Sequence, residues 1–244
     1  MTESAGRAKA RGGGRGAPRD LDRSIYDPDC KRCPRLAAYL AETHARHPDY
    51  WCRPVSPFGE AGAHIVLVGL APGLHGANRT ARPFTGDFAG ILLYQTLHRL
   101  GLATRPESRS ATDALQLRAT RITNAVKCAP PENKPLPGEI RRCNDYLEAE
   151  LRRCADARVL VALGRIAHDA VLMALHLKRS ALQFAHGAEH HLPTGRYLLD
   201  SYHCSRYNTQ TKRLTEEMFG AVLERACELA ELAELPRGAT RRRP

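Results

Sequence analysis

Short apolar runs that alternate with amphipathic segments constrain the fold of this chain more than any other feature. The runs at residues 63–69, 121–126, 159–163 and 196–201 have the length and composition of buried strands. Apolar residues at helical spacing occupy residues 34–46, 91–100, 137–153, 166–174 and 211–233. Strands in alternation with helices are typical of a parallel sheet that is covered on both faces. We therefore expect an α/β fold, a three-layer α/β/α sandwich with a central, mainly parallel four-stranded sheet.

The length and the two ends of the chain indicate one domain between basic tails. A chain of 244 residues suits a single domain with a sizeable core. Residues 1–20 are dominated by Gly, Ala and Arg, and residues 236–244 contain four Arg and two Pro, so neither end offers an apolar face to bury. We expect both tails to be disordered and residues 21–235 to form the domain.

The formal net charge of +11 is concentrated in these tails. Residues 1–20 carry +3 and residues 236–244 carry +4, which leaves only +4 for the rest of the chain. Tails of this kind favour weak, salt-sensitive contact with a polyanion such as DNA. Tails that only keep the protein in solution explain the same charge equally well.

The cellular compartment bears on how the eight cysteines are used. No apolar run approaches the roughly 18 residues of a membrane span, and the Arg-rich N-terminus lacks the apolar segment of a secretory signal. We therefore expect a cytoplasmic protein with no membrane partner. Disulfides are rare in that compartment, so metal ligation or simple burial explains the cysteines better.

Four of the cysteines are candidates for a metal site. Cys30 and Cys33 form a Cys-x-x-Cys pair, whereas Cys128 and Cys143 form a looser pair around the Pro-rich residues 129–135. Four thiolates suit a tetrahedral zinc ion and an iron–sulfur cluster about equally well. The spacing alone leaves the two metals as alternatives.

Two loops of small and polar residues follow predicted strands, at residues 69–80 and 202–208. The carboxyl ends of the strands in an open α/β sheet are where ligand crevices form. The two loops are therefore expected to face one pocket, although ordinary strand-to-helix turns are the alternative.

Several segments together resemble the uracil-DNA glycosylase superfamily, and in particular its fifth family. The matching segments are GLAPG at 69–73, HGANRT at 75–80, RPFTGD at 82–87, ITNAVKC at 122–128 and HCSRYN at 203–208. The resemblance covers the chain from about Cys30 to Phe219. It implies an α/β/α fold and the removal of uracil and related deaminated or damaged bases from DNA. It also implies a structural [4Fe-4S] cluster on Cys30, Cys33, Cys128 and Cys143.

The resemblance, read together with the chemistry of base removal, suggests roles for three side chains. A glycosylase must flip the target nucleotide out of the base stack and into a pocket. Phe84 matches the family's stacking aromatic, and the amide of Asn124 offers a donor and an acceptor to the edge of the base. His203 matches a histidine that donates to the carbonyl oxygen of the departing uracil, as an oxyanion hole does.

One departure from the wider superfamily concerns the water that attacks the sugar. Many members place Asp or Asn where this chain has Ala71, and the fifth family shares this absence. Asn78 and Asp87 are the side-chain candidates for positioning water, and backbone groups of residues 70–73 are an alternative. The predicted catalytic residues are His203, Asn124 and Asn78. The predicted substrate-binding residues are Gly69, Leu70, Ala71, Pro72, Gly73, Phe84, Asp87, Ser205, Arg206 and Asn208.

No candidate active-site lysine is evident, which favours a monofunctional glycosylase, acting as a monomer on DNA, over one that forms a Schiff base. The main rival is an iron–sulfur protein of the same fold that binds nucleic acid without catalysis. A second rival, a nucleotide-binding α/β enzyme, lacks both the dinucleotide fingerprint and the Gly-Lys-Ser/Thr of a P-loop.

Overall fold

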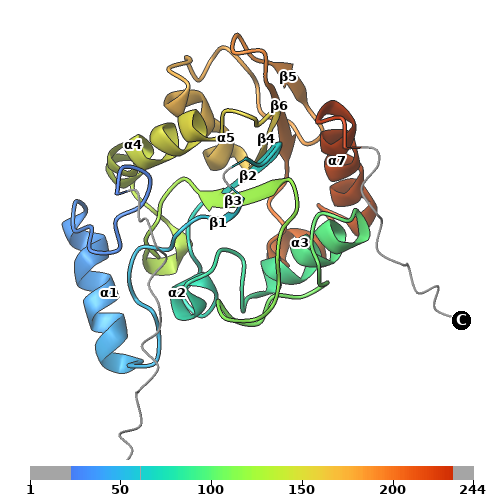
Figure 1. Cartoon of the computed structure of the whole chain (residues 1–244). Helices are drawn as coiled ribbons and strands as arrows, with labels where there is room; N and C mark the ends of the chain where they lie inside the picture. The colour runs from blue at the N-terminus through green and yellow to red at the C-terminus, as the bar shows by residue number, and fades with distance from the viewer. Residues whose placement is uncertain (1–22, 61, 233–244) are drawn as a thin grey trace, which may run out of the picture.

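The computed structural model describes residues 23–60 and 62–232 (Figure 1). The two tails expected at residues 1–20 and 236–244 lie outside the described residues. Within the described part of the chain, no helix has both the length and the apolar character that crossing a membrane requires.

A six-stranded sheet with the order β1-β3-β2-β4-β6-β5 forms the middle of the molecule. Its four central strands are parallel: β2 (Ile65–Gly69), β3 (Thr120–Asn124), β4 (Val159–Leu163) and β6 (Tyr197–Ser201). Nearly all of their residues are buried, which explains why they read as continuous apolar runs in the sequence. The four predicted strands and their parallel arrangement are confirmed, but the sheet has six strands rather than four.

Two short antiparallel strands complete the edges of the sheet. β1 (Phe58–Gly59) pairs with β3, and β5 (Glu189–His191) pairs with β6. With two and three residues respectively, they are too short to carry the alternating pattern that identifies a strand in a sequence.

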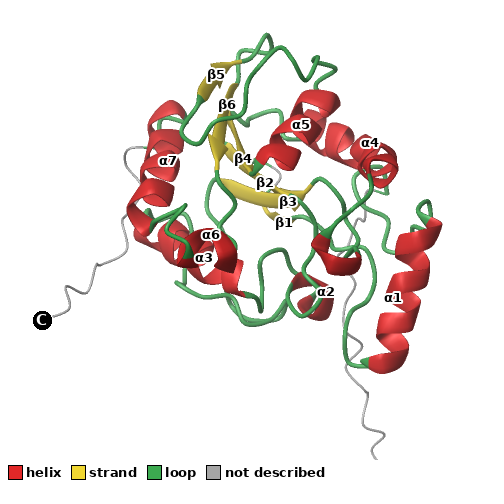
Figure 2. Ribbon diagram, turned by 180° about the vertical axis from the view of Figure 1, so that it is seen from behind, coloured by secondary structure: helices red, strands yellow, loops and turns green. Residues whose placement is uncertain are grey.

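Helices cover both faces of this sheet, so the predicted three layers are also confirmed. On one face, Ile65 and Leu67 of β2 share a core with Leu93 of α3 (Phe88–Arg99) and Phe219 of α7 (Glu216–Leu229). On the other face, Val66 and Val68 pack with α4 (Pro137–Arg153) and α5 (Arg165–Ala174). In both views α1 (Pro34–Arg46) lies at the periphery (Figures 1 and 2).

The C-terminal helix differs from the expected range of 211–233. A five-residue helix, α6 (Arg206–Gln210), follows β6 first, and Lys212 then adopts a left-handed backbone with φ of 57°. The hydroxyl of Thr215 accepts a hydrogen bond from the Met218 N–H and thereby starts α7 at Glu216. Two further short elements were not expected, namely α2 (Ala77–Thr80) and the 3₁₀ turn at Pro131–Asn133.

Candidate active site

A cavity of about 440 Å³ opens at the carboxyl ends of the parallel strands. The loops after β2, β3 and β6 and the start of α3 form its walls, so the structure brings the two polar loops to one pocket. The lining residues are Leu70, Ala71, Pro72, Gly73, Leu74, His75, Gly76, Ala77, Phe84, Asp87, Phe88, Ala89, Asn124, Asn133, His203, Ser205 and Arg206.

Two stacked rings form one wall of the cavity. The ring centroids of Phe84 and His203 are 5.8 Å apart with an interplanar angle of 29°. Phe84 has a left-handed backbone with φ of 53°, which is unusual for a bulky side chain. Gly69 makes this arrangement possible, because a Cβ there would lie 2.7 Å from the Phe84 ring and 2.5 Å from Asn124 Oδ1.

His203 is held in a form that donates one hydrogen bond. Burial lowers the pKa of His203 to about 4, so the imidazole is neutral near pH 7. Asn208 Nδ2 donates to the backbone carbonyl of His203 at 2.8 Å, and Ser205 Oγ caps α6 by accepting from the Asn208 N–H. Asn208 itself does not line the cavity and instead fixes the backbone of the histidine.

Asn124 brings an unpaired polar atom into the cavity. It is the last residue of β3 and is buried, yet its Oδ1 has no hydrogen-bond partner among the described residues. A buried polar atom without a partner is costly, and such atoms are uncommon unless a ligand or water satisfies them. The amide is therefore available to a bound base.

Asp87 supplies the only carboxylate among the residues that line the cavity. Its Oδ1 accepts from the Gly90 N–H at 3.1 Å and caps α3, while Oδ2 lies against Gly73 and Gly76. Burial raises the pKa of Asp87 above its ordinary value. A carboxylate of raised basicity at the wall of a pocket is suited to binding or deprotonating water.

The structure places Asn78 elsewhere. It is buried on α2, its Nδ2 donates to Cys52 Sγ at 3.5 Å, and it does not line the cavity. Gly69 does not line the cavity either. Because it has no side chain, it leaves room for Phe84 and Asn124, which do line the cavity. The other predicted substrate-binding residues, apart from Asn208, line the cavity.

Seven lining residues are absent from the predicted site, and three of them, His75, Phe88 and Asn133, have polar or aromatic side chains. His75 lies within a motif that the resemblance used, and its Nδ1 is 3.0 Å from Tyr50 Oη. Phe88 begins α3 and stacks under the guanidinium of Arg206, 5.9 Å from the ring centroid. Asn133 has φ of 58° within the Pro-rich turn after β3, and the Pro-rich composition was its only signal.

The four candidate metal-binding cysteines come from separate elements and meet beside α1. Cys33 precedes α1, Cys128 follows β3 and Cys143 lies on α4. Burial raises the pKa of Cys128, and the neighbouring Cys143, Cys30 and Cys33 raise it further, so the four thiols lie within electrostatic reach of one another. The backbone N–H of Lys127 donates to Cys143 Sγ at 3.3 Å. Four neighbouring thiols, of which Cys143 is buried and the others are partly buried, fit a metal or cluster site.

A second group of titratable side chains, His168, His190 and Asp200, has no sequence signal, and its members are paired with one another. His168 Nδ1 and His190 Nε2 lie 2.8 and 3.2 Å from the two carboxylate oxygens of buried Asp200. His168 Nε2 also faces the Leu182 carbonyl at 3.2 Å. Burial alone would lower the pKa of His168, but the hydrogen bond and charge of Asp200 outweigh burial and raise it. Both oxygens of Asp200 are thus occupied by histidine.

Comparison with known proteins identifies similar sequences over most of the chain. A family model described as the uracil DNA glycosylase superfamily matches residues 56–227. A type-5 uracil-DNA glycosylase of Thermus thermophilus is 52% identical over 208 residues, covering 83% of this chain and 94% of that protein. One of Pyrobaculum aerophilum is 43% identical over 81% of this chain and 88% of its own. A type-4 uracil-DNA glycosylase of Archaeoglobus fulgidus is 34% identical over 61% and 60%.

Proposed function

The chain belongs to the uracil-DNA glycosylase superfamily, in its fifth family, and on this premise we propose which of its residues remove the base. The protein is a DNA glycosylase, a hydrolase of N-glycosyl bonds that acts in uracil repair. We propose that it also removes related deaminated or damaged bases, and that it is monofunctional. No lysine is among the residues that line the described cavity, which supports a mechanism without a Schiff base.

The flipped base is proposed to bind between Phe84 and Asn124. The ring of Phe84 offers the π-face on which a base stacks, and the unpaired Oδ1 of Asn124 offers an acceptor to an N–H on the base. The backbone of residues 70–73 lines the same cavity and offers further hydrogen-bonding groups. These contacts suit a small planar base with donors and acceptors on one edge.

His203 is proposed to stabilise the departing base. When the C1′–N bond breaks, its electron pair leaves with the base and negative charge develops on the carbonyl oxygen. A neutral imidazole beside the stacking ring directs an N–H at that charge, and it needs no proton transfer to do so. The water oxygen then bonds to C1′ and its proton is released, so the products are the free base and an abasic sugar.

We propose that Asp87, rather than Asn78, positions the attacking water. Asp87 lines the cavity with a carboxylate of raised pKa, whereas Asn78 is directed at Cys52. The methyl group of Ala71 lines the cavity without offering a polar group. Ser205, Arg206 and Asn208 are proposed to hold the DNA strand and the histidine around the flipped nucleotide.

Cys30, Cys33, Cys128 and Cys143 are proposed to hold a [4Fe-4S] cluster. In a tetrahedral zinc site, Zn–S bonds of about 2.3 Å bring sulfur atoms to within about 3.8 Å of one another. Among the described residues, the only group of three or more ligand atoms that all lie within 4.8 Å of one another belongs to His168, His190 and Asp200. No three of the four cysteine sulfurs are therefore that close to one another. The wider spacing favours the larger inorganic core. The cluster would tie the segment before α1 and the loop after β3 to α4.

Iron and sulfide analysis of protein purified without oxygen tests the cluster. We expect a brown protein with about four iron atoms per chain, as a [4Fe-4S] cluster requires. Cys143→Ser should lose colour and solubility together, because metal binding and folding are coupled, whereas Cys227→Ser should keep both. Stoichiometric zinc without iron would overturn the assignment.

The remaining parts of the proposal concern setting and partners. We propose that the protein acts as a monomer in the cytoplasm on DNA that contains uracil or related lesions.

The observation that carries the mechanism is the meeting of Phe84, Asn124 and His203 in one cavity. The direct test is base release from a duplex with a single uracil, compared with the same duplex carrying thymine. We expect free uracil and an intact strand that contains an abasic site. Tight binding of the uracil duplex without base release would instead favour the non-catalytic iron–sulfur protein.

A further inference from the structure

We propose that the ion pair between Arg82 and Asp113 is a positioning device that holds Phe84 in its strained conformation and so aims its ring at the flipped base. The inference rests on the proposed stacking role of Phe84. The loop between α3 and β3, which contains Asp113, would then serve the active site without lining its cavity.

The starting observation is that Phe84 requires support. A bulky residue in the left-handed region is costly and persists only where the surrounding structure fixes it. On the far side, α3 approaches closely, since a Cβ on Gly90 would lie 1.8 Å from the Phe84 carbonyl oxygen. Free rotation of this segment would remove the ring from the cavity wall.

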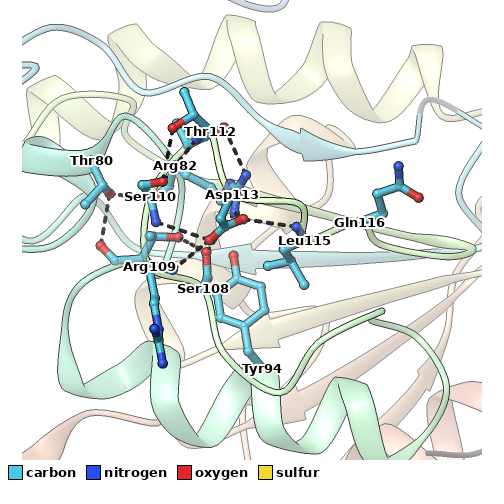
Figure 3. Close-up of polar contacts among 12 residues, drawn as sticks. Thr80, Arg82, Tyr94, Ser108, Arg109, Ser110, Thr112, Asp113, Leu115 and Gln116 are labelled. Carbon is cyan, nitrogen blue, oxygen red and sulfur yellow. Dashed lines mark hydrogen bonds and ion pairs between the residues drawn. The ribbon is translucent and has the colours of Figure 1, made fainter.

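Arg82, two residues before Phe84 in the chain, is fixed from several directions. It is buried, and its Nη1 contacts Asp113 Oδ1 at 2.6 Å and Ser108 Oγ at 3.0 Å (Figure 3). Its Nη2 donates to the Ala111 carbonyl at 3.0 Å, and the guanidinium lies 4.3 Å from the Phe58 ring centroid. Asp113 is the only negative charge that pairs with Arg82 among the described contacts.

Asp113 also folds its own loop. Besides Arg82, its carboxylate accepts backbone N–H groups of Arg109, Ser110 and Leu115 at 2.8, 3.2 and 3.1 Å (Figure 3). Burial would raise the pKa of Asp113, but these hydrogen bonds outweigh burial and lower it to about 2. Asp113 is therefore ionised near pH 7.

The residues immediately beside Phe84 are held by the same loop and by two helices. The Pro83 carbonyl accepts from Tyr94 Oη of α3 at 2.8 Å. Thr85 Oγ1 lies 2.7 Å from Ser108 Oγ, and the Thr85 carbonyl accepts from Thr80 Oγ1 at 3.0 Å. Both neighbours of Phe84 are thus fixed, and the Ser108 hydroxyl joins Thr85 to Arg82.

The test is a double-mutant cycle on uracil excision under single-turnover conditions, with Asp113→Asn and Phe84→Ala. We expect Asp113→Asn to lower the rate by about 10-fold to 100-fold, since small displacements of positioning groups have effects of this size. In the Phe84→Ala background the same change should lower it by less than about 2-fold, because the positioned ring is already absent. An equal loss in both backgrounds, or no loss in either, would overturn the proposal.

Asp169→Asn is the matched control, because Asp169 also pairs with an arginine and its side chain is 17% exposed, against 16% for Asp113. It should leave the rate unchanged. If Asp113→Asn fails to fold, Ser108→Ala keeps the ion pair and removes the hydroxyl that joins Thr85 to Arg82. Ser108→Ala should then show the same dependence on Phe84, and additive effects would count against the proposal.

A structural measurement separates this inference from the proposed function. The stacked rings of Phe84 and His203 should give ring-to-ring proton NOEs in the parent and in Asp169→Asn, but weakened ones in Asp113→Asn. If the parent fails to release uracil while these NOEs behave as expected, the proposed function fails and the positioning device stands. Unchanged NOEs in Asp113→Asn refute the positioning device whatever the activity.

Discussion

Two adjacent residues of β3, Thr123 and Asn124, belong to buried polar regions that differ in their hydrogen bonding: the first is fully paired and the second contains an unpaired atom. Thr123 Oγ1 donates to Glu150 Oε2 at 2.7 Å, and Glu150 also pairs with Arg121 and Lys127 at 2.8 and 2.9 Å. Asn124 lies on the other face of the strand, and its Oδ1 has no partner among the described residues. The closed network connects the sheet to α4, while the open group faces the cavity. On β3, the unpaired amide therefore faces the site, and the saturated network holds the scaffold together.

Breaking the closed network should produce the largest change in stability. Glu150→Ala leaves the positive charges of Arg121 and Lys127 buried without their partner, which typically costs about 3–5 kcal/mol of unfolding free energy. Denaturant unfolding measures this loss. Replacement of the partly buried Glu148 by Ala should cost below about 1 kcal/mol, because its partners Arg152 and His176 are exposed. Equal costs at the two positions would remove the distinction between the regions.

Removing the unpaired amide of Asn124 should slow the reaction and leave the stability of the fold nearly unchanged. Asn124→Ala removes an unpaired buried acceptor, so its unfolding free energy should stay within about 1 kcal/mol of the parent or increase. Loss of its contact to the base should slow uracil excision by about 100-fold, the size expected for one preorganised polar group. A variant that is strongly destabilised yet fully active would reverse the assignment of the two regions.

Two histidines, His203 and His168, should give opposite and smaller dependences of stability on pH. The lowered pKa of His203 means that the unfolded chain binds more protons between about pH 6.5 and 4, so its contribution to stability is lost as pH falls through that range. The raised pKa of His168 means that its contribution is present below about pH 6.5 and is lost as pH rises through the folded-state pKa. Thermal unfolding of His203→Ala and Asp200→Asn from pH 4 to 8 measures both. A pH profile that neither substitution alters would contradict both assignments.

Local patterns predicted the parts of the fold that local chemistry determines. α1 and α4 begin at prolines, and in α4 Glu139 accepts from the Leu136 N–H at 2.7 Å, so their bounds follow from the sequence. The expected C-terminal helix was wrong at its start, because a left-handed residue and a new cap interrupt it. β1 and β5 depend on a neighbouring strand for their existence and carry no pattern of their own.

The candidate site likewise has residues that the sequence identified and features that it did not reveal. The sequence identified Phe84, Asn124 and His203, because they follow strands or lie in motifs. It did not reveal the backbone of Phe84, the pairing of Asp113 with Arg82, or the turn of Asn78 toward Cys52. These features join residues that are distant in sequence, so only tertiary packing determines them.

We propose that the open polar groups of the cavity, with His203 as donor to the departing base, remove uracil. Single-turnover excision by His203→Ala, with exposed His191→Ala as its control, tests this most directly. Loss of one preorganised donor should slow excision by about 10²–10³-fold, while binding of the uracil duplex changes little and His191→Ala keeps the parent rate. Excision by His203→Ala at close to the parent rate would show that His203 is not the donor to the departing base.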